Sequence, residues 1–491
     1  MLAVVASCSR SRAVFEADPL AEVVRRIASG DVSAADYLKH YLSRIATLDR
    51  AGPELRAVIE LHSKRELPAD ARPSGLLHGA PVLIKDNIET ADGMLTTAGS
   101  LALVDAPPPR RDAFIVRRLR EAGALVFGKT NLSEWANIRS RDSTSGWSAR
   151  GGLTRNPRRE GHSASGSSSG SAVAVAAGLC AAAVGTETNG SIVSPASACG
   201  IVGLKPTLGS LSRSGIIPIS HWQDTPGPMT RTVRDAALMM DAMTAHDPED
   251  PLSSPPPPGA VSGHLSLFHA DVLRGRRLGV VRGLCGSHPG VLSRFDHVLR
   301  LLREAGAEVV ENVELPNQRA AGGLAWRALL TEFRADLNDY LRKRGGRVDS
   351  LAALIAFNRE HAAEEMPWFG QDLFEEAEKR GTPEALAEAA ESRGLARRLA
   401  GPEGIDAALK GHRLDALICP TNDPAGKIDL EKGDADVRVA CTPAAVAGYP
   451  HLTLPMGDVE GLPAGFSFLG TAWSDPLLLA LGDALEARLA A

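Results

Sequence analysis

The chain alternates between short apolar segments and helical ones from about residue 76 onward, and this alternation constrains its fold most strongly. The segments "APVLIKDN" and "GALVFGKTN" are typical of buried strands bounded by turns, and "DAFIVRRLREA" between them has a helical pattern. The same texture continues through "CAAAVGTETNGS" and "CGIVGLKPT". This strand–helix–strand order predicts an α/β sheet with covering helices.

The remaining segments add helices, late strands and one break. Ser33 can cap a helix whose apolar residues recur at helical spacing up to Ile45. After Asp247 a proline-rich stretch excludes both helix and strand. Strands are predicted at "RRLGVVRG" and "GAEVVENVEL" around a helix near 291–305, and charged helices follow to about Leu399. The proline-rich stretch is a candidate domain boundary. Alternatively, the late strands "LDALICPT", "YPHLTLPMG" and "GFSFLGTA", before a closing helix, return to the first sheet.

Composition excludes several classes of protein. The chain has 491 residues, of which 44% are hydrophobic and 23% charged, and this is typical of a globular protein. Its formal charge of −5 gives no electrostatic support for binding nucleic acid or anionic membranes. It contains no run of 18 apolar residues, so no membrane span is expected.

The six cysteines are scattered without a C-x-x-C pair, so we expect buried free thiols, with no disulfide framework and no zinc site. "VASC" at Val5–Cys8 resembles a lipoprotein cleavage box, but only seven residues precede the cysteine and none of them is basic. We expect a cytoplasmic enzyme. The alternative is a periplasmic or lipid-anchored one, if this segment ends a truncated signal peptide.

Two segments match known catalytic motifs in their residue pattern, but the residues around them do not suit the structure that each motif needs. "GALVFGKT", from Gly123 to Thr130, matches a phosphate loop, but its four central residues are an apolar strand where the flexible loop should be. Lys129 is therefore interpreted as a residue at a strand end. "GSSSG" matches a nucleophile elbow at Ser168, yet a polar loop precedes it where the elbow needs a strand. A Ser168 triad remains an alternative, and its histidine is one of His162, His221 and His451.

Three other segments fit one mechanism together. Lys85 ends the apolar strand "PVLIK", and the interpretation without a catalytic role is a lysine that emerges from the sheet into water. "GHSASGSSSGSAVAVAAG" would be a linker, except that its serine loop runs directly into an apolar helix. In "VGTETNGSIVSPA" a strand ends at the tight turn Asn189–Gly190, which places Ser191 beside backbone N–H groups free to face a ligand. Apolar flanks argue against a simple surface turn there.

These segments resemble the amidase signature family, whose serine hydrolases use a Ser–Ser–Lys triad. The resemblance covers roughly residues 76–232 and 414–489, and it includes "GAPVLIKDNI", "GSSSGSAVAVAAG", "GTETNGSIVSPAS", "DTPGPM" and "AGYPHLTLPMG". It implies a three-layer α/β/α fold with a large, mixed, twisted sheet and an inserted helical region. We expect a single domain over residues 1–491, with its core at about 76–246 and 405–491 and a variable insertion at about 247–404.

The resemblance assigns roles by motif. Lys85 corresponds to the triad lysine and Ser191 to the nucleophile. Ser167, 24 positions before Ser191, corresponds to the bridging serine that follows a cis peptide bond. The oxyanion-hole backbone donors correspond to Thr188, Asn189 and Gly190. A serine needs a base to take its proton, and burial can lower the pKa of a lysine by several units and so supply one. No metal or organic cofactor is implied.

The pattern indicates the substrate less firmly than the mechanism. This chain departs from the commonest "GTDTGGSIR" at Glu187, Asn189 and Val193, and the absent arginine separates it from the amidotransferase-like branch. It looks most like bacterial peptide amidases, which release ammonia from C-terminally amidated peptides. Aryl acylamidases and carbamate-cleaving relatives are alternatives. A Ser–His–Asp esterase and a catalytically silent binding protein are weaker ones.

We expect a small-molecule or peptide amide as the substrate, no nucleic-acid partner, and a monomer or homodimer. Pocket residues outside the signature are expected from the middle of the chain. There Met366, Trp368 and Phe369 either line an apolar cleft or anchor an inserted helical layer.

Overall fold

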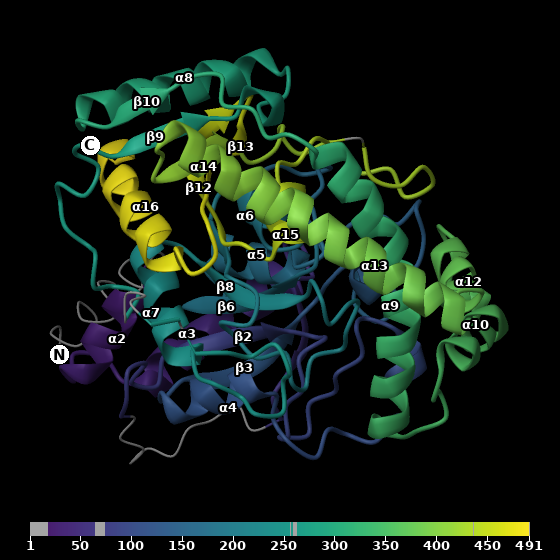
Figure 1. Cartoon of the computed structure of the whole chain (residues 1–491). Coiled ribbons are helices and arrows are strands. Elements are labelled where there is room, and N and C mark those ends of the chain that lie inside the picture. Colours follow the sequence, from purple (N-terminus) through teal and green to yellow (C-terminus); the bar gives the residue numbers. More distant parts are fainter. Residues whose placement is uncertain (1–17, 64–73, 256, 259–262, 436, 491) are drawn as a thin grey trace, which may run out of the picture.

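A single twisted sheet of eleven strands forms the centre of the protein (Figure 1). The computed structural model describes residues 18–63, 74–255, 257–258, 263–435 and 437–490. In spatial order the strands are β1 (Val58–Leu61), β3 (Leu125–Thr130), β2 (Pro81–Lys85), β6 (Ala182–Glu187), β8 (Thr225–Thr230), β7 (Val202–Lys205), β12 (His451–Val459), β13 (Leu462–Leu469), β11 (Ala416–Pro420), β9 (Arg277–Val280) and β10 (Glu308–Val310). A separate ribbon pairs β4 (Trp147–Ser148) with β5 (Gly152–Leu153).

The sheet is mixed, as the resemblance implies. Strands β3, β2 and β6 run parallel, β11, β9 and β10 run parallel, and the strands between these two groups pair antiparallel. Every residue of β2 and β6 is buried, so both strands lack the alternation of a half-exposed sheet. Because β2 and β6 are parallel neighbours, their carboxyl ends, Lys85 and Glu187, meet at one edge of the sheet.

Helices cover both faces of the sheet. On one side α7 packs against α4 and α16, while α5 and α6 pack against each other and against the strands. The helices are α2 (Leu20–Ala28), α3 (Ala34–Arg44), α4 (Phe114–Glu121), α5 (Ser169–Ala176), α6 (Val193–Cys199), α7 (Val233–Met243), α8 (Pro289–Glu304), α9 (Gln318–Arg344), α10 (Leu351–Glu360), α11 (Ala362–Glu365), α12 (Asp372–Glu378), α13 (Pro383–Ala400), α14 (Asp406–His412), α15 (Thr442–Ala447) and α16 (Asp475–Leu489). Shorter turns are the π-helical η1 (Ile45–Asp49) and η5 (Gly401–Ile405), and the 3₁₀ turns η2 (Leu101–Leu103), η3 (Glu134–Asn137) and η4 (Arg282–Leu284).

Local sequence explains several of these elements. Ser33 caps α3 through a capping box with Asp36, as its position predicts. The hairpin of β12 and β13 turns through Glu460 and Gly461, which both have positive φ, as a two-residue type I′ turn requires. Helix α5 is buried from Ser169 to Val175. Its sequence "SGSAVAVA" contains only small residues, and their largest polar group is a serine hydroxyl, so the helix can pack inside the protein.

The late strands return to the first sheet, and so do two strands from the middle of the chain. β9 and β10 fall inside the stretch 247–404 yet extend the edge of the sheet beyond β11. Helices α9, α10, α12 and α13 gather on one side of the molecule, away from α7 and α16 (Figure 1). We infer one domain in which the helical insertion runs from α9 to α13.

Strand β8 was not predicted, because "TPGPMT" carries two prolines and a glycine. Its ladder with β7 comprises only Val202 opposite Thr230 and Gly203 opposite Met229. Pro226 and Pro228 lie beyond that short ladder, where β7 does not need an N–H donor from β8.

The described cysteines, Cys180, Cys199, Cys285, Cys419 and Cys441, are free and buried, as expected. Cys8 and the segment Val5–Cys8 lie outside the described residues. No helix in the described ranges is both long enough and apolar enough to cross a bilayer.

Candidate active site

Lys85 occupies the centre of a polar cluster at the carboxyl end of β2. Its Nζ atom donates to the Oγ atoms of Ser167 at 2.8 Å and Ser168 at 2.9 Å, and to Oγ1 of Thr186 at 3.0 Å. The backbone oxygen of Thr186 lies 3.3 Å away. The strand therefore places the Lys85 amine among hydroxyl groups and not in water, so the interpretation of Lys85 as a lysine emerging into water is wrong.

Burial controls the charge of this lysine. The side chain is fully buried, and desolvation lowers the pKa of Lys85 to about 7, against the opposing effect of the Asp224 and Glu187 carboxylates. A lysine with a pKa in this range can be present at neutral pH as a neutral amine with a free lone pair. Such an amine can accept a proton from a hydroxyl group.

The two serines that contact Lys85 differ in their other bonds. Ser168 Oγ donates its proton to the Thr186 backbone oxygen at 3.0 Å and accepts from the Thr186 N–H at 3.2 Å. Among the described residues, Ser167 Oγ has only Lys85 as a hydrogen-bond partner. Ser167 is thus free to pass a proton, whereas the proton of Ser168 is already engaged. The peptide bond between Gly166 and Ser167 is cis, as the resemblance implies.

The turn after β6 carries Ser191 to the same place. Its backbone oxygen accepts from the Ser168 N–H at 3.1 Å, which joins the serine loop to the turn. Gly190 has φ of +89°, and a Cβ there would lie 2.9 Å from Sγ of Cys441, so glycine is required. Within the described residues, the backbone N–H groups of Asn189, Gly190 and Ser191 donate to no other atom. They are available to a ligand.

Glu187 fixes the shape of this turn. Its buried carboxylate accepts from the N–H groups of Ile192 at 2.8 Å and Val193 at 3.1 Å, at the start of α6. The carboxylate therefore fills the position that an N-cap side chain takes at other helices. Sequence reasoning marked Glu187 only as a departure from the common motif.

Ser191 faces a cavity of about 430 Å³. Its walls include a stripe of α9 and part of η3, where Ala136 and Asn137 have left-handed backbone angles. The lining side chains are neutral: Ala136, Asn137, Ile138, Thr188, Asn189, Ser191, Ile219, Gln223, Ala325, Trp326, Leu329, Thr442 and Val446, with Gly166 and Gly322. The cavity is sized for a small ligand and offers no charged group to it.

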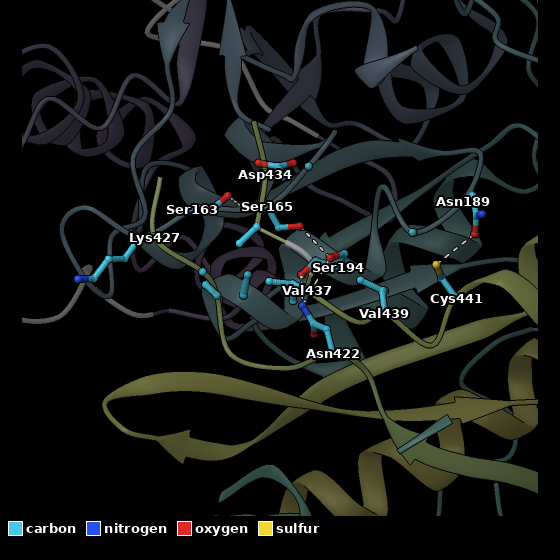
Figure 2. A pocket seen from close by; sticks show the side chains of 16 residues that line it. Ser163, Ser165, Asn189, Ser194, Asn422, Lys427, Asp434, Val437, Val439 and Cys441 are labelled. Carbon is cyan, nitrogen blue, oxygen red and sulfur yellow. Dashed lines mark hydrogen bonds between the residues drawn. The ribbon is translucent and has the colours of Figure 1, made fainter. Parts of the chain in front are cut away.

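A second cavity of about 230 Å³ shares Gly166 and Asn189 with the first, and Figure 2 shows the side chains that line it. Ser165 and Ser194 hydrogen-bond to each other in its wall at 2.8 Å, and the thiol of Cys441 donates to Asn189 Oδ1 at 3.1 Å. The charged residues Lys427 and Asp434 also line it. The two cavities differ in charge, because only the second is lined by charged side chains, and Asn189 lines both.

The two alternative motifs lack the partners that their own chemistry would need. Ser168 contacts none of the three candidate histidines: His162 faces the Glu160 carbonyl, His221 pairs with Asp336, and His451 bonds to Ser467. Lys129 lies within strand β3, where its Nζ donates to the Ile88 carbonyl and to Thr96. Ser168 therefore has no histidine partner for a triad, and Lys129 is a residue of the strand framework, as their contexts predicted.

The middle of the chain contributes to the wall of the cavity at Ser191, but through other residues than the sequence predicts. Met366, Trp368 and Phe369 do not line the cavity at Ser191. Phe369 packs edge-on against Trp147 at 5.3 Å between ring centroids, with the Arg139 guanidinium 4.1 Å from its ring centre. Helix α9 supplies the wall instead, through Gly322, Ala325, Trp326 and Leu329.

Sequence reasoning also missed two residues beside the turn. Buried Asp224 accepts from Thr188 Oγ1 at 2.6 Å and from the N–H groups of Ile219 and Ser220, and burial raises the pKa of Asp224 to about 6. Gln223 donates to the Thr188 backbone oxygen at 2.7 Å. The signal was present in "QDTPGPM", but only the fold brings it to the turn.

Known proteins resemble this chain along nearly its whole length. The Amidase family model matches residues 36–479. A probable amidase of Arabidopsis thaliana is 38% identical over 467 residues, which cover 91% of this chain and 85% of its own. The structure of native peptide amidase from Stenotrophomonas maltophilia superimposes with a TM-score of 0.90 at 49% identity, covering 96% and 97% of the two chains. An amidase family protein from Bacillus anthracis str. Ames gives 0.85 at 32% identity, covering 98% and 92%.

The fold and these likenesses define an amidohydrolase. The chain belongs to the Amidase family.

Proposed function

We propose that the protein hydrolyses carboxamides through Ser191 as nucleophile, Ser167 as proton relay and Lys85 as base. The observation that carries the proposal is the fully buried Lys85 amine, with its lowered pKa, 2.8 Å from Ser167 Oγ. Backbone N–H groups at Thr188, Asn189 and Gly190 are proposed as the oxyanion hole. The donors of Asn189 and Gly190 have no acceptor within the described residues.

In the proposed mechanism, neutral Lys85 takes the proton of Ser167, and Ser167 takes the proton of Ser191. The Ser191 oxygen attacks the amide carbon, and the turn stabilises the resulting oxyanion. The protonated lysine returns a proton through Ser167 to the amide nitrogen, the C–N bond breaks, and the amine or ammonia leaves. Water attacks the Ser191 ester by the same relay, which releases the acid and restores the serine.

Peptides with a C-terminal amide are the proposed substrates. The solved peptide amidase shares 49% of residues with this chain, and the neutral cavity at Ser191 has room for a residue next to an uncharged carboxamide. The second cavity favours one alternative. A pocket of about 230 Å³ that Asn189 also lines could hold the N-substituent of an anilide or a carbamate.

Two measurements test the proposal. Mass spectrometry after reaction with a serine-directed phosphonate should place the label on Ser191, and Ser191→Ala should lose both the label and the hydrolysis. A label on Ser168 contradicts the assignment. Ammonia release from amidated dipeptides should exceed cleavage of matched anilides and carbamates. A wide margin in favour of anilides or carbamates overturns the peptide amidase assignment.

A further inference from the structure

A chain of buried polar groups runs from the inserted helices to the proposed oxyanion turn. It begins with an ion pair between Glu332 on α9 and Arg393 on α13, whose side chains are 6% and 3% exposed. Arg393 Nε lies 2.9 Å from one carboxylate oxygen, and its Nη2 lies 2.7 Å from the other. This bidentate geometry fixes the plane of the guanidinium.

The free corner of that guanidinium reaches Gln223. Arg393 Nη1 donates to Gln223 Oε1 at 2.5 Å, and Gln223 Nε2 donates to the Thr188 backbone oxygen at 2.7 Å. An arginine can only donate, so the amide oxygen of Gln223 must face Arg393. Its NH₂ group must therefore face Thr188. The ion pair thus selects one of the two orientations of the glutamine amide.

The bond to Thr188 determines the direction of a neighbouring donor. In a trans peptide unit the C=O of one residue and the N–H of the next point in opposite directions. Anchoring the Thr188 oxygen on Gln223 therefore aims the Asn189 N–H away from it. The other side of Thr188 is also held, because its hydroxyl donates to Asp224 at 2.6 Å.

We propose that Gln223, oriented by the Glu332–Arg393 pair, is a positioning residue that holds the Asn189 N–H in the direction of the developing oxyanion. The inference rests on the proposed function, since it requires Asn189 to be an oxyanion donor. It also gives the helical insertion a role in the rate of the reaction, in addition to its role as a cavity wall.

The first test is Gln223→Met, which keeps the length of the side chain, removes the donor to Thr188 and leaves the buried ion pair in place. Complete loss of one oxyanion donor typically costs roughly 100- to 1000-fold in rate, so a misaimed donor should cost roughly 10- to 100-fold in kcat. The KM for an amidated dipeptide should change less than threefold. Gln223→Glu, which keeps an acceptor for Arg393 but has no NH₂ group, should show the same loss.

Gln371→Met is the matched control. Gln371 is also buried in this fold, and its Nε2 donates to the Ile355 backbone oxygen at 3.2 Å, while its Oε1 accepts from Asn358. It lies in the insertion and does not line the cavity at Ser191. This variant should lose thermal stability and retain the kcat of the wild type.

A peptide aldehyde provides a second measurement, because its adduct with a serine carries the oxyanion. Its affinity for Gln223→Met should fall by the same factor as kcat/KM. Wild-type kcat in either Gln223 variant, an effect confined to KM, or an equal loss of kcat in Gln371→Met overturns the inference. Ser191→Ala separates the two proposals. If it remains active, the proposed function fails; if it is inactive while the Gln223 variants are fully active, only the positioning role fails.

Discussion

The Nζ atom of Lys85 lies 2.8 Å from Oγ of Ser167, in a site where the amine has no exposed surface. Burial is what makes this contact chemically useful, because a lysine in water would hold its proton at neutral pH. The fold achieves the burial by placing Lys85 at the end of a strand with neighbours on both sides.

Replacing Lys85 by Met should abolish most of the activity while keeping the volume of the side chain. A positioned base contributes typically 10²- to 10⁴-fold, so kcat should fall by about 1000-fold or more. Steady-state ammonia release measures this. Lys205→Met is the matched control, because Lys205 is equally buried but donates to the Pro206 carbonyl at 2.8 Å, away from the serines. Equal losses in the two variants would show that burial of charge, and not base catalysis, explains the effect.

The pH dependence of kcat/KM should have an acid limb near pH 7. The base must be neutral, and the pKa of Lys85 is lowered to about 7, so activity should fall about tenfold per pH unit below that value and level off above it. A limb that remains near pH 10 would contradict a neutral lysine. Asp224→Asn should move the limb to lower pH, since the Asp224 carboxylate raises the pKa of Lys85. A shift in the opposite direction would rule out this coupling.

Stability should rise with pH because of the buried lysines. Burial lowers the pKa of Lys205 to about 8, below its ordinary value of 10.5. Between these values the unfolded chain binds one more proton than the folded chain at this position, so the free energy of unfolding increases with pH. Denaturant titrations of Lys205→Met should show this slope reduced by about 1.4 kcal/mol per pH unit between about pH 8 and 10. The exposed Lys410, replaced in the same way, is the control, and equal slopes in all three proteins would refute the assignment.

Trp326 should contribute to substrate binding and not to the chemical step. Its side chain lines the cavity at Ser191 and remains 42% exposed, so a ligand can cover it further. Trp326→Ala should raise the KM of amidated dipeptides with an apolar last residue about five- to tenfold, which corresponds to about 1 kcal/mol of lost apolar burial. The kcat should remain within a factor of two. Trp368→Ala is matched in type and exposure and lies outside this cavity, so it should change neither constant.

The framework around the site could be predicted from sequence because each element carries its own signal. Strands β2 and β6 begin with apolar runs, α3 begins at a capping serine, and the turn before Ser191 contains the Asn189–Gly190 pair. Strand β8 could not be predicted, because its prolines are tolerated only where the neighbouring ladder is short. Local sequence does not contain that neighbour.

The buried polar groups that connect Glu332 to Thr188 could not be predicted from sequence for a related reason. Arg393 and Gln223 are 170 positions apart, and each alone resembles an ordinary surface residue. The packing of α13 on α9 holds Arg393 in the position from which it reaches Gln223. Met366, Trp368 and Phe369 are large and apolar, but these properties do not indicate which face of an insertion meets the substrate.

Helix α9 carries Leu329 in the cavity wall and Glu332 in the ion pair, one turn apart. A shift of this helix that made room for a larger substrate would also pull on the guanidinium, the glutamine and the Thr188 carbonyl. Changes of substrate in this protein should therefore arise by exchanging side chains along the α9 stripe while the helix axis stays fixed. New substrate specificity is thus limited to replacements at a few positions. Insertions or deletions in α9 should lower kcat even where they improve substrate binding.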